Sequence, residues 1–79
     1  MTEQELIIGL KNKDEDAFRE LVFTRKALVF NTVLGFLQNQ EDAEDVSQDV
    51  FIKILESIGQ FKGESALSTW VYRVSVTSA

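Results

Sequence analysis

The rest of this chain is organised around residues 41–58, EDAEDVSQDVFIKILESI. It contains neither glycine nor proline, and its acidic first turns suit the positive end of a helix dipole. At 100° per residue, its apolar side chains fall on one broad face, which needs a core to pack against. These side chains are Ala43, Val46, Val50, Phe51, Ile54, Leu55 and Ile58. The stretch therefore predicts an amphipathic helix around which the other segments are arranged.

The polar face of this helix carries one aliphatic residue. By the same angular step, Ile52 lies in the middle of the face formed by Glu41, Asp45, Gln48, Asp49 and Glu56. An isoleucine framed by carboxylates and an amide suits a docking patch for another protein. The alternative is a solvated face with a single exposed isoleucine, which is common on soluble proteins. Taken alone, the stretch favours the second interpretation.

The composition limits the chemistry. A chain of 79 residues forms at most one small domain, and it has no cysteine for disulfides and no histidine, the commonest general base and metal ligand. It has no glycine-rich phosphate loop, and its dense acids Glu41–Asp49 are typical of a solvated helix. We therefore expect no enzymatic activity, cofactor or metal. No signal peptide or membrane span is recognisable, and a cytosolic protein is expected.

The net charge of −5 is unevenly distributed. Residues 39–60 contain one positive and six negative charges, whereas residues 61–79 contain two positive charges and one negative. An acidic total argues against sequence-independent nucleic-acid binding through phosphate neutralisation. An acidic total does not exclude a small local contact between the chain and a nucleic acid.

Capping signals divide the chain into about four helices. Thr2 and Glu5 have the spacing of a capping box for a first helix that ends near Lys11 to Lys13. Asp14 is a suitable cap for a second helix, from about Glu15 to about Gln38. Its predicted main stripe is Phe18, Leu21, Val22, Leu28, Val29, Val33 and Phe36, and its second stripe is Phe23, Phe30, Leu34 and Leu37. Such a helix should be central, with neighbours on more than one side.

Arg25 projects into the main stripe of the second helix. It can extend its charge to the edge of the stripe or meet an acid on another helix, and the sequence does not choose between these.

Two further boundaries complete the predicted all-α bundle. Asn39 is expected to cap the third helix and Gly59 to end it. After a short connection, Ser65 is expected to cap a fourth helix. Its apolar face is Leu67, Trp70, Val71 and Val74. Because Val74 to Ala79 contains no stop signal, we expect that this last helix is cut and that residues 1–79 are a fragment of a longer protein.

Residues 42–74, DAEDVSQDVFIKILESIGQFKGESALSTWVYRV, resemble region 2 of bacterial sigma factors, and within these the extracytoplasmic-function group. The group has an acidic DAEDxxQ(E/D)xF helix, then a Phe, a Gly-containing loop and Ser-x-x-x-TW-x-YR. The matching positions are Asp42, Ala43, Glu44, Asp45, Gln48, Asp49, Phe51, Phe61, Gly63, Ser65, Thr69, Trp70, Tyr72 and Arg73. The N-terminal part fits more loosely, through Asp14, Ala17, Phe18 and Leu21.

The resemblance implies two partners. Region 2 docks on the clamp coiled coil of the β′ subunit of core RNA polymerase through the acidic helix. This docking set maps onto Asp45, Gln48 and Asp49, the residues around Ile52. The resemblance thus reverses the earlier preference and favours a docking patch. By analogy with the group, an anti-sigma factor is a further expected partner.

The second implied partner is the −10 element of promoter DNA. The family holds a flipped non-template base in the loop before the fourth helix, and aromatic side chains stack on bases. The corresponding candidates are Lys62, Ser65, Ser68, Thr69, Trp70, Tyr72 and Arg73. Alternatives remain: Trp70 shares a face with core residues, Phe61 can simply plug the bundle, and Arg73 can bind a carboxylate.

The chain also departs from related patterns. Primary sigma factors have two adjacent tryptophans where this chain has Trp70 and Val71, which implies weak DNA melting. The second domain, which would bind the −35 element, is absent from these residues. The competing hypothesis is a helical adaptor module that binds proteins and never contacts DNA.

Overall fold

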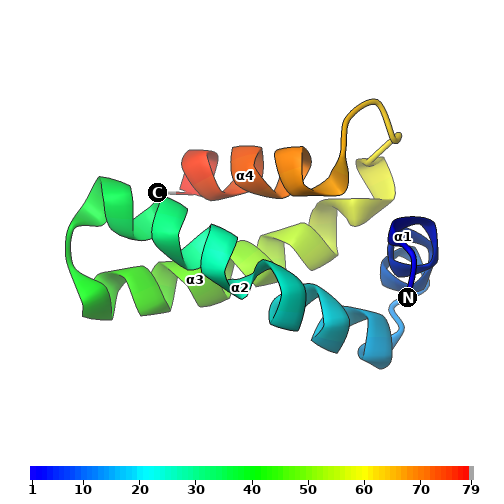
Figure 1. The fold of residues 1–79 in the computed structure, drawn as a ribbon, viewed down its shortest axis with the longest axis horizontal. Coiled ribbons are helices and arrows are strands. Elements are labelled where there is room, and N and C mark those ends of the chain that lie inside the picture. Colours follow the sequence, from blue (N-terminus) through cyan, green and yellow to red (C-terminus); the bar gives the residue numbers. More distant parts are fainter. Residues whose placement is uncertain (79) are drawn as a thin grey trace.

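The computed structural model describes residues 1–78 and is entirely built of helices and short connections (Figure 1). In order, the elements are α1 (Glu3–Lys11), α2 (Glu15–Leu37), α3 (Gln40–Ser57), the short 3₁₀ turn η1 (Ile58–Gln60) and α4 (Leu67–Ser78). The predicted all-α class is confirmed. The sequence also predicts that the last helix is cut at the end of the sequence shown. That end, Ala79, lies outside the described residues.

Three of the four helix caps that local sequence predicted are present. The Thr2 hydroxyl accepts a hydrogen bond from the Glu5 N–H, and the Thr2 N–H donates to the Glu5 carboxylate, both at 3.1 Å. Asp14 accepts from the Asp16 N–H at 3.1 Å, and Asn39 accepts from the Asp42 N–H at 3.0 Å. These bonds satisfy backbone donors that a helix N-terminus leaves unpaired.

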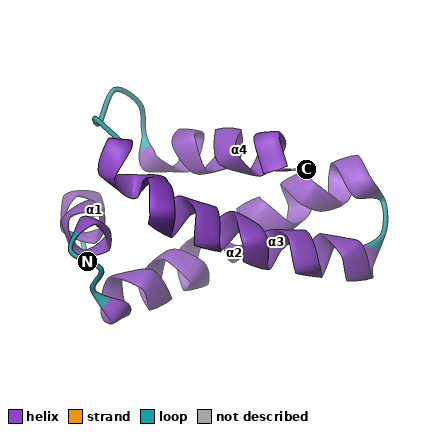
Figure 2. Cartoon of the chain, turned by 180° about the vertical axis from the view of Figure 1, so that it is seen from behind, coloured by secondary structure: helices purple, strands orange, loops and turns teal. Residues whose placement is uncertain are grey.

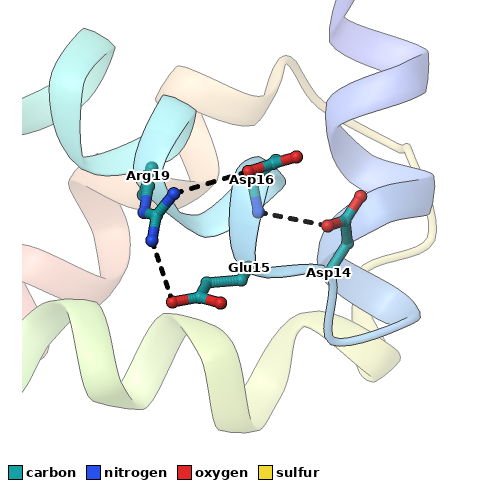
Figure 3. Close-up of polar contacts among 4 residues, drawn as sticks. All are labelled: Asp14, Glu15, Asp16 and Arg19. Atoms are coloured by element: carbon teal, nitrogen blue, oxygen red, sulfur yellow. Dashed lines mark hydrogen bonds and ion pairs between the residues drawn. The ribbon is translucent and has the colours of Figure 1, made fainter.

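The first turn of α2 adds two ion pairs to its Asp14 cap (Figure 3). The Arg19 guanidinium lies 3.1 Å from the Glu15 carboxylate and 3.6 Å from that of Asp16. All three side chains are exposed, and pairs of this kind stabilise a helix by only about 0.5 kcal/mol or less. The capping bond, which satisfies a backbone donor, is the stronger of the two contributions.

The central helix is α2, which packs against α1, α3 and α4 (Figure 1). Viewed from behind, α3 crosses α2 obliquely as the chain runs back, and α4 lies above the crossing (Figure 2). The apolar face predicted for α3 forms much of the core: Ala43, Val50, Phe51, Ile54 and Ile58 are buried, and Val46 and Leu55 are half-buried. The docking candidates are therefore on the opposite side of a helix that the core holds firmly.

Two of the predicted core residues of α2 are in fact on the surface: Phe23 is 84% exposed and Phe36 is 59% exposed. The buried positions of α2 follow each other mostly at four-residue steps: Ala17, Leu21, Val29 and Val33. Each such step turns the side chain about 40° beyond a full circle, so the buried direction rotates along the helix. Phe23 lies away from this path, and at the helix end the path has reached the half-buried Leu37 instead of Phe36.

Arg25 meets an acid on another helix. Its guanidinium lies 3.6 Å from the Glu3 carboxylate of α1, and its side chain is only 16% exposed. This contact settles the alternatives that the sequence left open and connects the N-terminus of α1 to the middle of α2.

The approach of α1 to α2 depends on a glycine. A Cβ atom added to Gly9 would lie 2.6 Å from the Cβ atom of Ala17, a distance that real Cβ contacts essentially never show. Ala17 is completely buried. The two backbones therefore pack at a distance that admits no side chain at position 9.

The predicted boundaries around the loop need two corrections. The α-helix of α3 ends at Ser57 and continues as the η1 turn, so Gly59 lies inside that turn and the left-handed backbone conformation occurs at Gly63, with φ 74°. Ala66, not Ser65, immediately precedes the first helical residue of α4.

Within residues 1–78, no helix combines the length and the apolarity needed to cross a bilayer.

Candidate functional site

The first candidate surface is the outer face of α3. Asp45, Gln48, Asp49 and Ile52 occupy positions i, i+3, i+4 and i+7, and all four side chains are exposed. Ile52 is 54% exposed, a large value for an isoleucine. The structure thus brings together every residue of the predicted docking set, and we call these four residues the acidic face.

The carboxylates of the acidic face are available to a partner. Among residues 1–78, neither Asp45 nor Asp49 forms an ion pair. Beside this face, Gln48 and Glu44 line a hollow of about 170 Å³ between α3 and α2, whose other walls include Phe30 and Lys26. These α2 residues were not assigned to the docking surface from the sequence, because periodicity describes one helix at a time.

The second candidate surface is built on an aromatic contact. Phe61 follows η1 and is 96% buried, and its ring lies against that of Trp70 on α4 with a centroid separation of 5.4 Å and an interplanar angle of 49°. Tilted pairs of this kind are favourable because a ring edge meets a ring face. Phe61 is therefore a core residue, as one of the two interpretations held. Trp70 is half-buried and serves both core and surface.

A hollow of about 260 Å³ lies between this aromatic pair and the loop after η1. Its walls are Gln60, Phe61, Lys62, Glu64, Ser65, Trp70 and Arg73, and we call it the loop hollow. The volume is slightly below the range of about 300–1,000 Å³ typical of ligand pockets, which suits a small group. The two cations and one carboxylate in its wall suit a ligand with a negative charge and hydrogen-bonding edges.

The structure brings together four of the seven predicted DNA-binding residues in this hollow: Lys62, Ser65, Trp70 and Arg73. The other three, Ser68, Thr69 and Tyr72, are exposed on α4 but do not line the hollow. Two wall residues, Gln60 and Glu64, were missed. Their position on either side of Phe61–Gly63 was the available signal, because residues that flank a short loop converge on the space it encloses.

The loop backbone also offers hydrogen-bond donors. In the part of the chain that the structure describes, the N–H groups of residues 62–65 form no backbone–backbone hydrogen bond. Backbone N–H groups in such loops can bind phosphate or base oxygens.

In residues 1–78, no cluster of three or more carboxylate, imidazole or thiol groups is arranged to hold a metal ion.

These features define a small helical domain with two separate polar surfaces, one acidic and one mixed. The sequence of residues 21–78 matches the model of the family described as Sigma-70 region 2. This match covers most of the chain, so the chain belongs to the sigma-70 region 2 family, as its motifs predicted.

Curated relatives agree with this assignment. The chain is 39% identical over 82 residues to the ECF RNA polymerase sigma-E factor of Haemophilus influenzae, an alignment that includes 100% of the chain and 41% of the relative. It is 34% identical over 79 residues to the protein of that name from Escherichia coli, with coverages of 100% and 41%. It is 32% identical over 77 residues to the RNA polymerase sigma-H factor of Pseudomonas aeruginosa, with coverages of 98% and 40%. The chain therefore spans about two fifths of the length of these relatives.

Proposed function

We propose that this chain is the region 2 domain of an alternative sigma factor of the extracytoplasmic-function type, which binds core RNA polymerase and the −10 promoter element in transcription initiation. The observation that carries the proposal is the acidic face, whose exposed carboxylates have no ion-pair partner within residues 1–78, in a chain of the sigma-70 region 2 family. The adaptor alternative gains no support from that family.

The acidic face suits a basic helical partner. Asp45 and Asp49 can each accept paired hydrogen bonds from an arginine, while Gln48 can both donate and accept. Ile52 supplies a small apolar centre that such a contact can bury. These properties fit the clamp coiled coil of the β′ subunit, and the complementary charges would fix the orientation of the complex.

The loop hollow suits one unstacked base of the −10 element. Lys62 and Arg73 are placed for phosphates, and the face of Trp70 can stack on a base. The Ser65 hydroxyl and the loop N–H groups can bind base acceptors, while Glu64 can accept a hydrogen bond from an exocyclic amino group. Unstacking a base costs a few kcal/mol, which these contacts offset.

The exposed row on α4 extends this surface. Ser68, Thr69 and Tyr72 lie outside the hollow, where we expect them to contact the nucleotides that flank the captured base. By analogy with factors of this type, an anti-sigma factor that regulates the protein is a further proposed partner, and the cytoplasm is the proposed location.

The docking assignment is tested by a double substitution on the acidic face. We expect D45A with Q48A to weaken binding of the full-length protein to a β′ clamp fragment by about 2–4 kcal/mol, since interface residues at the centre of a contact carry most of its energy. Binding can be measured by calorimetry, with the melting temperature of each variant as a check of folding.

A matched control uses the same residue types elsewhere. D16A with Q4A removes one carboxylate and one amide from exposed positions on α2 and α1, and it should leave the affinity for the clamp fragment nearly unchanged. Unchanged affinity in the D45A, Q48A protein would show that the acidic face is not the docking surface.

A further inference from the structure

A lysine of α1 holds the start of the loop. The Lys11 ammonium donates a hydrogen bond of 2.8 Å to the Phe61 carbonyl, across 50 positions of sequence. The bond is partly buried, and a hydrogen bond from a charged donor is roughly twice as strong as a neutral one. In Figure 1, α1 lies crosswise below the end of α3, near the point where the loop begins.

Few other contacts fix the path of the chain at this point. The Phe61 N–H donates to the Ile58 carbonyl at 3.0 Å, and the Phe61 ring is held by Trp70. Over residues 62–65, the described structure contains no backbone–backbone hydrogen bond. The Phe61 carbonyl is therefore the last anchored backbone group before the wall residues Lys62, Glu64 and Ser65.

The flank of α1 also faces the loop. Ile7, Ile8 and Lys11 share a shallow hollow of about 230 Å³ with Lys62 and Gly63. The orientation of the Phe61 peptide determines the direction in which Lys62 leaves the η1 turn, because one peptide plane joins the two residues. The Lys11 side chain thus lines a different hollow of the loop from the one that Trp70 lines.

We propose that Lys11 is a positioning residue for DNA capture: by binding the Phe61 carbonyl, it sets the conformation in which Lys62, Glu64 and Ser65 enclose a base. This role rests on the proposed function of the loop hollow. Lys11 does not line that hollow and need not touch DNA. It makes α1 a support for a loop that lies far away in the sequence.

The chain contains a matched control for this contact. The Lys13 ammonium donates a hydrogen bond of 2.7 Å to the Leu55 carbonyl of α3. The donor and acceptor types are the same and the sequence separation is similar, but the acceptor belongs to the helix and not to the loop. Loss of the Lys13 bond should therefore have no effect on base capture.

The experiment uses the full-length protein assembled with core RNA polymerase. The probe is a labelled single-stranded DNA oligonucleotide selected from a randomised pool by the wild-type holoenzyme. We expect K11M to weaken probe binding about five- to tenfold, the range for loss of one partly exposed charge-assisted hydrogen bond. K13M should bind as the wild type does, and K11R, which keeps a charged donor, should restore most of the affinity.

A spectroscopic measurement separates positioning from general stability. Trp70 is the only tryptophan of the sequence shown, and its ring contacts that of Phe61. The intrinsic fluorescence of this chain therefore reports the surroundings of Trp70. In the isolated chain, K11M should shift the emission maximum of Trp70 while K13M leaves it unchanged. If K11M does not fold, K11Q replaces it, because its amide is uncharged and one bond shorter than the lysine side chain.

The outcomes are distinct. Weaker probe binding in K11M or K11Q, with wild-type binding in K13M and recovery in K11R, supports the proposal. Equal binding by K11M and wild type overturns it and leaves the proposed function intact. Failure of the wild-type holoenzyme to select or bind any single-stranded probe overturns the proposed function, and the role of Lys11 with it.

Discussion

Two buried serines differ in whether their hydroxyl groups have partners. On α4, the Ser75 hydroxyl donates a 2.9 Å hydrogen bond to the Val71 carbonyl, and the residue is completely buried. On α3, the Ser47 hydroxyl is buried with no partner among the described residues. A buried polar group without a hydrogen bond is destabilising, because it loses its bonds to water and gains none in return.

We therefore expect S47A to increase the free energy of unfolding by about 1 kcal/mol and S75A to decrease it by about 0.5–1 kcal/mol. Urea denaturation of the two variants and the wild type measures both changes. A loss of stability in S47A comparable with that in S75A would mean that the Ser47 hydroxyl is bonded in solution.

The sequence could predict only part of this residue-scale picture. Ser47 lies four residues after Ala43 and three before Val50, so helical spacing places it on the buried face. Whether its hydroxyl finds an acceptor depends on side chains of other helices. The same limit explains Phe23 and Phe36, because spacing gives a face but not the direction from which neighbours cover it.

At the scale of elements, α1 is a short helix that depends on its N-terminal cap. The backbone and hydroxyl hydrogen bonds of Thr2 hold the pKa of the Glu5 carboxyl below its ordinary value. A carboxyl whose pKa is lower in the folded state stabilises that state above its ordinary pKa. This stabilisation is lost as the pH falls through the lowered pKa.

We therefore expect the stability difference between wild type and E5Q to be larger at neutral pH than at a pH below the lowered pKa of Glu5. Helix content followed by circular dichroism during urea denaturation at both pH values measures it. E41Q, which removes an acid from the first turn of α3 that forms neither a capping bond nor an ion pair among the described residues, gives the comparison. An E5Q difference that does not change with pH would contradict the role of the Glu5 carboxylate.

Helix starts were predictable because a cap is a local interaction between residues three positions apart or fewer. Thr2, Asp14 and Asn39 were all predicted correctly as caps. The end of α3 and the start of α4 were not, because Phe61 enters the core and the chain must adopt the η1 turn to place it there. Gly59 and Ser65 have suitable residue types for the ends of helices, but tertiary packing determined the boundaries.

At the scale of the whole molecule, the charges are segregated. Residues 39–60 carry six negative charges and one positive charge, whereas residues 61–79 carry a small positive excess. All six of these acids lie on α3, the helix that carries the acidic face. An excess of one sign on a binding surface accelerates encounter with an oppositely charged partner and is screened by salt.

We expect the association rate constant of the full-length protein with the β′ clamp fragment to fall by about tenfold between about 0.1 M and about 1 M salt, as the Debye length shortens from about 10 Å to about 3 Å. The dissociation rate constant should change much less. Stopped-flow measurements provide both. An association rate constant that does not depend on salt would contradict electrostatic steering by the acidic face.

The fold class and the acidic face followed from periodicity within single segments, and the family followed from motif spacing. The contacts between distant segments did not. The bonds of Lys11 to Phe61 and of Arg25 to Glu3 join residues that no pattern connects. Tertiary structure supplies these relations, so they could not be read from the sequence.

The contact between Gly9 and Ala17 has a consequence for how such domains can vary. Because the space at position 9 is smaller than a methyl group, this position tolerates no enlargement unless α1 moves away from α2. A movement of α1 would also displace Lys11, two residues further along the same helix. A designer who wishes to diversify the outer surface of α1 should therefore keep Gly9 unchanged. A single added carbon there would displace Lys11 and so disturb its hydrogen bond to the Phe61 carbonyl at the start of the loop.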